Sequence, residues 1–155
     1  MKQDLTTLTQ DFWLIFNKGE NFFAEFFMKK GFGHIGILTR DKFNWFLLDP
    51  TYTELKIDIL PFKPEDNVPR ILLNKFRTHK IIKLTMMKNL HVNGNIAILK
   101  VFFPRVVSCV SMVKYIVGLK NNALTPYQLF LKLIKMKKNG ISTYEKNILN
   151  IQYVI

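Results

Sequence analysis

The sequence is poor in cysteine: it has one, Cys109, among 155 residues. A single thiol cannot close an internal disulfide, which excludes a small secreted scaffold held together by disulfides. Apolar runs are short as well, since the first residues lack the apolar core of a signal peptide and no stretch is long enough to cross a bilayer. We therefore expect a cytoplasmic protein without a transmembrane segment.

Acidic residues are also scarce: the chain has 11 Asp and Glu against 23 Lys and Arg, a formal net charge of +12. Such a surplus favours association with an anionic polymer or a membrane surface. The sequence contains no RNP motif, zinc-finger spacing or basic-zipper heptad. Nucleic acid is therefore not the expected partner, and a Lys- and Asn-rich composition is also typical of AT-rich genomes.

Apolar and aromatic residues, in contrast, are abundant. Hydrophobic residues make up 48% of the chain and aromatic residues 14%, including 14 Phe, which excludes a disordered chain. At this length one hydrophobic core is expected. We predict a single domain over residues 1–155, with its core at about 12–136 and a C-terminal extension at 140–155.

Hydrophobic periodicity predicts strands first and helices later, an α+β arrangement in which an antiparallel sheet packs against helices. The expected strands are residues 12–16, 34–38, 43–48, 54–60, 79–85 and 95–103. The expected helices are residues 20–29, a short one at 70–76, one from Cys109 to Gly118 and one that begins at Pro126, with a weak capping box at Ser142 and Glu145.

The cysteine lies at the start of one of these helices. Ser108 precedes Cys109 as a good N-cap, and apolar residues recur three and four positions apart from Met112 to Val117. The thiol is then expected in the first turn on the core-facing side, where unpaired amides and the helix dipole favour a thiolate. Two interpretations stay open, a nucleophile and a small apolar filler.

A catalytic thiol needs a base, and the base needs an orienting partner. His79 and His91 lie in basic or polar surroundings and are expected to be solvated, whereas His34 opens a strand. An even-numbered hairpin loop would place Asp49 directly opposite His34 or one diagonal step away, and Gly36 would leave room there for a helix or ligand. An odd-numbered loop would separate the two, and the alternative is that Asp49 only begins a turn.

The chain also contains an ordered series of motifs. Phe-Gly-His-Ile-Gly-Ile-Leu at 32–38 and Asn-Trp-Phe-Leu-Leu-Asp-Pro at 44–50 precede Ser-Cys-Val-Ser-Met-Val-Lys-Tyr-Ile-Val-Gly-Leu at 108–119 and Leu-Thr-Pro-Tyr-Gln-Leu-Phe at 124–130. Over about residues 12–136 the series resembles the circularly permuted branch of the NlpC-like papain-fold superfamily, in particular small uncharacterised phage and bacterial proteins. In that branch the histidine strand precedes the cysteine helix.

The resemblance implies a permuted papain-like α+β fold and a cysteine hydrolase or acyltransferase that uses no cofactor or metal. Cys109 would be the nucleophile, His34 the general base and later acid, and Asp49 the orienting residue. The substrate would be a peptide amide or an acyl ester, with cell-wall peptides as the leading candidate in a phage context, where the protein could also be virion-associated. Two alternatives remain: an inactive structural or virion protein of the same fold, and a basic module that binds nucleic acid or anionic surfaces.

Overall fold

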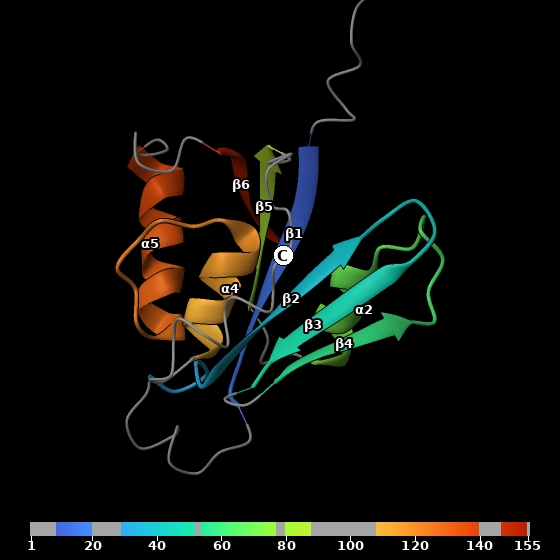
Figure 1. Ribbon diagram of the computed structural model, residues 1–155, viewed down its shortest axis with the longest axis horizontal. Helices are drawn as coiled ribbons and strands as arrows, with labels where there is room; N and C mark the ends of the chain where they lie inside the picture. The colour runs from blue at the N-terminus through green and yellow to red at the C-terminus, as the bar shows by residue number, and fades with distance from the viewer. Residues whose placement is uncertain are drawn as a thin grey trace, which may run out of the picture.

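The computed structural model describes residues 9–19, 29–51, 54–76, 80–87, 108–139 and 147–154. Its centre is one six-stranded antiparallel sheet with the strand order β4-β3-β2-β1-β5-β6 (Figure 1). The strands are β1 (Thr9–Asn17), β2 (His34–Arg40), β3 (Trp45–Pro50), β4 (Leu55–Leu60), β5 (Lys80–Met87) and β6 (Ile148–Val154). The helices are α2 (Val68–Lys75), α4 (Cys109–Val117) and α5 (Pro126–Asn139).

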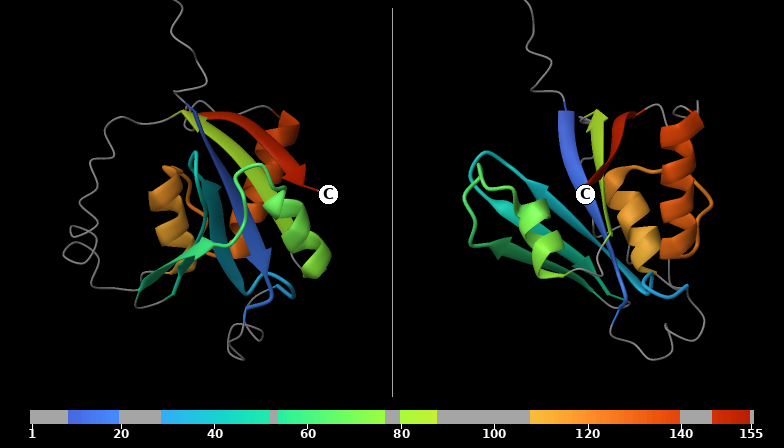
Figure 2. Two further views of the ribbon diagram at one scale, coloured as in Figure 1. Left: turned by 90° about the vertical axis from the view of Figure 1, so that its right-hand side faces the viewer. Right: turned by 180° about the vertical axis from the view of Figure 1, so that it is seen from behind.

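Helices cover both faces of the sheet. Helices α4 and α5 pack on one face and α2 packs on the other (Figure 1, Figure 2). Strand β1 lies near the middle and contributes to both cores: Leu14 and Phe16 belong to the α4–α5 side, and Trp13 and Ile15 belong to the α2 side. The two-sided burial explains why this strand is a continuous apolar run rather than an alternating one.

The predicted permuted papain-like α+β fold is wrong. Of the described residues, 41% lie in strands and 30% in helices, and every described strand belongs to one antiparallel sheet. The predicted change from strands to helices along the chain does not hold to the end, because residues 148–154 form β6. The expected C-terminal extension thus supplies an edge strand that pairs with β5.

Most of the predicted elements within the described residues are present. The strands expected at 12–16, 34–38, 43–48, 54–60 and 79–85 correspond to β1 through β5, with shifted ends. The helices expected at 70–76, at Cys109 and at Pro126 correspond to α2, α4 and α5. The helix expected at 20–29, the strand expected at 95–103, the capping box at 142–145, and both His79 and His91 lie outside the described residues, apart from Lys29.

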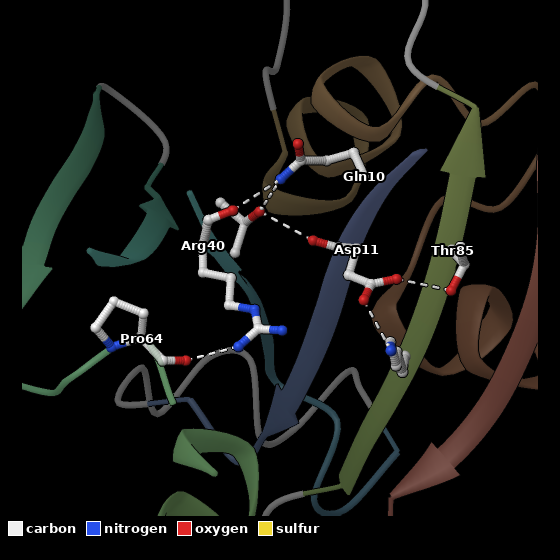
Figure 3. A network of polar contacts seen from close by, with 7 residues as sticks. Gln10, Asp11, Arg40, Pro64 and Thr85 are labelled. Atoms are coloured by element: carbon white, nitrogen blue, oxygen red, sulfur yellow. Dashed lines mark hydrogen bonds and ion pairs between the residues drawn. The ribbon is translucent and has the colours of Figure 1, made fainter. Parts of the chain in front are cut away.

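Two tryptophans form the centre of the core beneath α2. The rings of Trp13 and Trp45 lie 5.0 Å apart between centroids. The Lys83 ammonium lies 5.2 Å from the Trp13 ring, and the Arg40 guanidinium lies 5.3 Å from the Trp45 ring. Arg40 also donates a hydrogen bond to the carbonyl of Pro64 at 2.6 Å (Figure 3). One cation thus lies over each of the two buried rings, which adds cation–π attraction to apolar burial.

Asp11 connects β1 with both neighbouring strands. Its carboxylate accepts a hydrogen bond from Thr85 at 2.7 Å and pairs with Lys83 at 2.8 Å, both on β5 (Figure 3). Its backbone carbonyl accepts a hydrogen bond from the Thr39 hydroxyl on β2 at 2.9 Å, and Gln10 donates to the same hydroxyl. Asp11 therefore connects three central strands, with its carboxylate bonded to β5 and its backbone carbonyl bonded to Thr39 on β2.

We predict that Asp11→Ala destabilises the protein by about 1–3 kcal/mol, because it leaves the half-buried Lys83 and Thr85 groups without their acceptor. The free energy of unfolding from urea titration measures the loss. The matched control is Glu65→Ala, which removes an exposed carboxylate and should cost less than about 0.5 kcal/mol. Equal losses for the two variants would contradict the structural role of Asp11.

Among the parts of the chain that the structure describes, no helix is both long enough and apolar enough to traverse a membrane.

Candidate functional site

His34 is the first residue of β2, and the turn before it is built around glycine. The Gly33 N–H donates to the carbonyl of Asn17 at 2.8 Å, and Asn17 is the cross-strand partner of His34. A Cβ added at Gly33 would lie 1.9 Å from the carbonyl oxygen of Lys18, so only glycine fits. This close backbone approach fixes where the imidazole enters the sheet.

Asp49 reaches His34 through the register of the β2–β3 hairpin. Arg40 pairs with Trp45, so the connecting loop has an even number of residues, as the parity argument required. Extending the register beyond Ile37 and Leu48 places Asp49 across from Gly36, one diagonal step from His34. The His34 Nε2 and Asp49 Oδ1 atoms are 2.5 Å apart. The predicted His34–Asp49 pair is therefore present in the structure.

Cys109 is placed by the start of α4. Ser108 is the N-cap, in extended backbone conformation, and its hydroxyl accepts the Ser111 N–H at 3.2 Å. Gly118 ends the helix in the left-handed conformation, with φ of 79°. The Cys109 side chain is half-buried against the α4–α5 core and lies near enough to the His34 imidazole to raise the pKa of the ring. The thiol is thus both a packing residue and a partner of the imidazole.

His34 and Cys109 belong to opposite faces of the sheet. Strand alternation puts His34 on the same face as Leu38, which belongs to the α2 core, whereas Cys109 contacts the α4–α5 core. They meet because His34 is the terminal residue of its strand and α4 packs alongside β2 (Figure 1). The site therefore lies at an end of the sheet, not over the middle of one face.

The electrostatics of the site stabilise the protonated form of His34. Burial by itself lowers the pKa of His34, but hydrogen bonds with Cys109 and Asp49 and the attraction of their negative charge outweigh burial, so the pKa is raised above its ordinary value of 6.5. Since Asp49 occupies Nε2, the nitrogen available to the thiol is Nδ1. The His34 side chain is 24% exposed and that of Asp49 41%, so the pair is open to solvent.

The helix start offers amide donors next to the thiol. The Ser111 N–H bonds to the Ser108 hydroxyl and the Met112 N–H bonds to the Ser108 carbonyl. Within the described ranges, the N–H groups of Cys109 and Val110 have no hydrogen-bond acceptor. An oxyanion formed at the thiol could accept from these two N–H groups, which makes Val110 a candidate for a second donor.

Gly36 has a different role from the one expected. A Cβ at this position would lie 3.5 Å from the Leu48 carbonyl oxygen and 4.0 Å from Leu47 Cδ1, both on β3, with no described helix atom within 4 Å. No helix in the described part of the chain comes that close to Gly36, so the expected close approach of a helix is not seen there, and the room for a ligand stays a prediction. The glycine that the site needs is Gly33, and its signal was the Gly-Phe-Gly sequence directly before His34.

Comparisons with known proteins give no relative. No family model matches the chain, and no match was found among the curated proteins or the solved structures. The resemblance to NlpC-like proteins stays a prediction, and the site rests on its own geometry. Within the described ranges, no group of three or more His, Cys, Asp or Glu side chains is arranged to hold a metal ion.

We predict that Gly33→Ala destabilises the protein by about 1–3 kcal/mol, because the new methyl group collides with backbone that cannot move freely. The matched control is Gly36→Ala, whose Cβ would make ordinary contacts and should cost less than about 1 kcal/mol. Urea unfolding monitored by circular dichroism compares the two. Similar free energies of unfolding would show that the approach to Lys18 does not constrain the turn.

We predict that Asp49→Asn lowers the pKa of His34, because the variant keeps the shape but removes the attracting charge. NMR titration of the ring protons measures the pKa directly. The raised pKa also makes protonated His34 stabilise the folded protein: this contribution to the free energy of unfolding is fully present below pH 6.5 and is lost as pH rises through the pKa of the folded state. An unchanged His34 titration in Asp49→Asn would contradict the pairing.

Proposed function

We propose that this chain is a thiol-dependent hydrolase or acyltransferase that acts through Cys109, His34 and Asp49. One observation carries the proposal: the His34 imidazole contacts the Asp49 carboxylate at 2.5 Å and has the Cys109 side chain near enough to raise its pKa. Nucleophile, base and orienting group in this order are the arrangement that acyl transfer requires. The three side chains come from α4, β2 and β3, elements separated along the chain.

Each group has a defined task in the proposed reaction. His34 removes the thiol proton as the Cys109 sulfur forms a bond to the carbonyl carbon of an amide or ester, and the carbonyl electrons move to the oxygen. The Cys109 N–H stabilises the resulting oxyanion. Collapse of the intermediate breaks the bond to the amine or alcohol, which leaves with the proton from His34, and a thioester remains.

The second half of the reaction regenerates the thiol. Water, or an acceptor alcohol or amine, gives a proton to His34 and attacks the thioester carbonyl, and the carbon–sulfur bond then breaks. The imidazolium returns its proton to Cys109. Asp49 holds the ring by accepting from Nε2 and stabilises its positive charge throughout, which agrees with the raised pKa of His34.

A purely structural role fits the arrangement less well. A cysteine that only fills the core needs no imidazole beside it, and an exposed ion pair contributes only about 0–1 kcal/mol to stability. The half-open His34–Asp49 pair is therefore a weak stabilising device. The partial exposure of all three side chains, however, suits a group that must meet a substrate.

The proposed substrate is a peptide amide or an acyl ester. A cell-wall peptide is the candidate that the sequence resemblance implies, and a net charge of +12 supports encounter with the anionic polymers of a cell wall. Stem peptides and model acyl esters are therefore the substrates to compare first.

We predict that an activated ester such as p-nitrophenyl acetate adds one acetyl group to Cys109, detected by intact-protein and peptide mass spectrometry. Cys109→Ser should lose the labelled peptide, and His34→Ala should lower the acylation rate by about a hundredfold or more, because the general base is removed. The matched control is His91→Ala, a histidine expected from the sequence to be solvated, which should acylate at the unaltered rate. Equal acylation in His34→Ala and the unaltered protein would contradict the proposed mechanism.

A further inference from the structure

Strand β4 forms one edge of the sheet and carries exposed apolar residues. It pairs with β3 on one side only, and no described strand pairs with its other side. Ile57 is 56% exposed and Ile59 is 66% exposed. Exposed edges are normally protected, because free backbone groups and apolar side chains together invite pairing with another strand.

The backbone groups that point outward from β4 can be assigned. The Thr51 N–H donates to the Glu54 carbonyl at 2.8 Å, which makes these two a hydrogen-bonded pair that continues the β3–β4 ladder. Hydrogen-bonding direction alternates along a strand. Residues 54, 56 and 58 therefore face β3, and the N–H and C=O groups of Leu55, Ile57 and Ile59 face away from the sheet.

The charges on β4 are self-complementary. Lys56 and Asp58 flank Ile57, both are exposed, and neither has an ion pair with another described residue. Two β4 strands that run antiparallel about a two-fold axis at Ile57 bring Lys56 opposite Asp58 of the partner subunit, twice. In the same register Ile57 meets Ile57 of the partner subunit, and Leu55 meets Ile59 of the partner subunit. These aliphatic side chains lie on the face of the sheet opposite Lys56 and Asp58.

We propose that β4 pairs with β4 of a second copy of this chain, with the two-fold axis at Ile57, and so forms a homodimer with one continuous sheet. Three independent features select this register: the outward backbone groups, the aliphatic pairs and the crossed Lys56–Asp58 pairs. A second copy is the favoured occupant because the same short strand supplies both halves of every pair. The catalytic groups lie on β2, β3 and α4, so the proposal does not depend on the proposed activity.

Charge reversal tests the register. Lys56→Asp and Asp58→Lys each put like charges opposite one another at two equivalent places, and each should raise the dimer dissociation constant by about tenfold or more. The double variant with both substitutions restores opposite charges and should recover the original constant. An equimolar mixture of the two single variants should form a heterodimer, because one chain then carries both acids and the other both bases. Sedimentation velocity over a concentration series measures the dissociation constant of the two single variants, the double variant and the mixture.

Two further variants distinguish β4–β4 pairing from the effects of misfolding and of a changed net charge. Ile57→Pro removes one outward N–H without breaking the ladder to β3, so it should abolish dimerisation while circular dichroism stays unchanged. Lys135→Asp, an equal change of charge on the exposed side of α5, should leave the dissociation constant as it was. A monomer at every concentration, or a dimer that the single reversals do not weaken, would overturn the proposal.

Discussion

The imidazole of His34, held between a thiol and a carboxylate, is the contact on which the account of this protein depends. It exists only if three separate conditions hold together. Gly33 must let the chain pass Lys18, the β2–β3 hairpin must keep its even register, and α4 must begin beside the first residue of β2. Each condition is a backbone constraint, so the chemistry of the site follows from the way the sheet is assembled.

The two cores position different residues of that contact. The α4–α5 core fixes the height and direction of the cysteine helix through Val110, Val113 and Val117, which are almost fully buried. The α2 core fixes β2 and β3 through Trp45 and Leu38. His34 and Asp49 lie on the strands that the α2 core holds, and Cys109 lies on the helix that the α4–α5 core holds. The contact between them therefore reports whether both cores are packed correctly.

Much of the site could be predicted from the sequence because it depends on local rules. The Ser108 cap predicted Cys109 in the first turn of a helix, and strand parity with an even-numbered loop predicted Asp49 opposite His34 or one diagonal step away. Strand β6 could not be predicted in the same way. Ile148 and Ile151 are both buried although they are three apart, because the pairing with β5 shifts between Thr85 and Met86 and breaks the alternation. That irregularity removes the alternation that identifies a strand in a sequence, so this edge strand was not predicted.

The most direct measurement of the central contact is the rate of Cys109 alkylation by iodoacetamide as a function of pH, in the unaltered protein and in His34→Ala. A free thiol has a pKa of about 8.5, so an unassisted cysteine reacts slowly at neutral pH. The account predicts that at about pH 6.5 the unaltered protein reacts at least about tenfold faster than His34→Ala, and that the difference closes towards about pH 9. Identical pH profiles for the two proteins would contradict it.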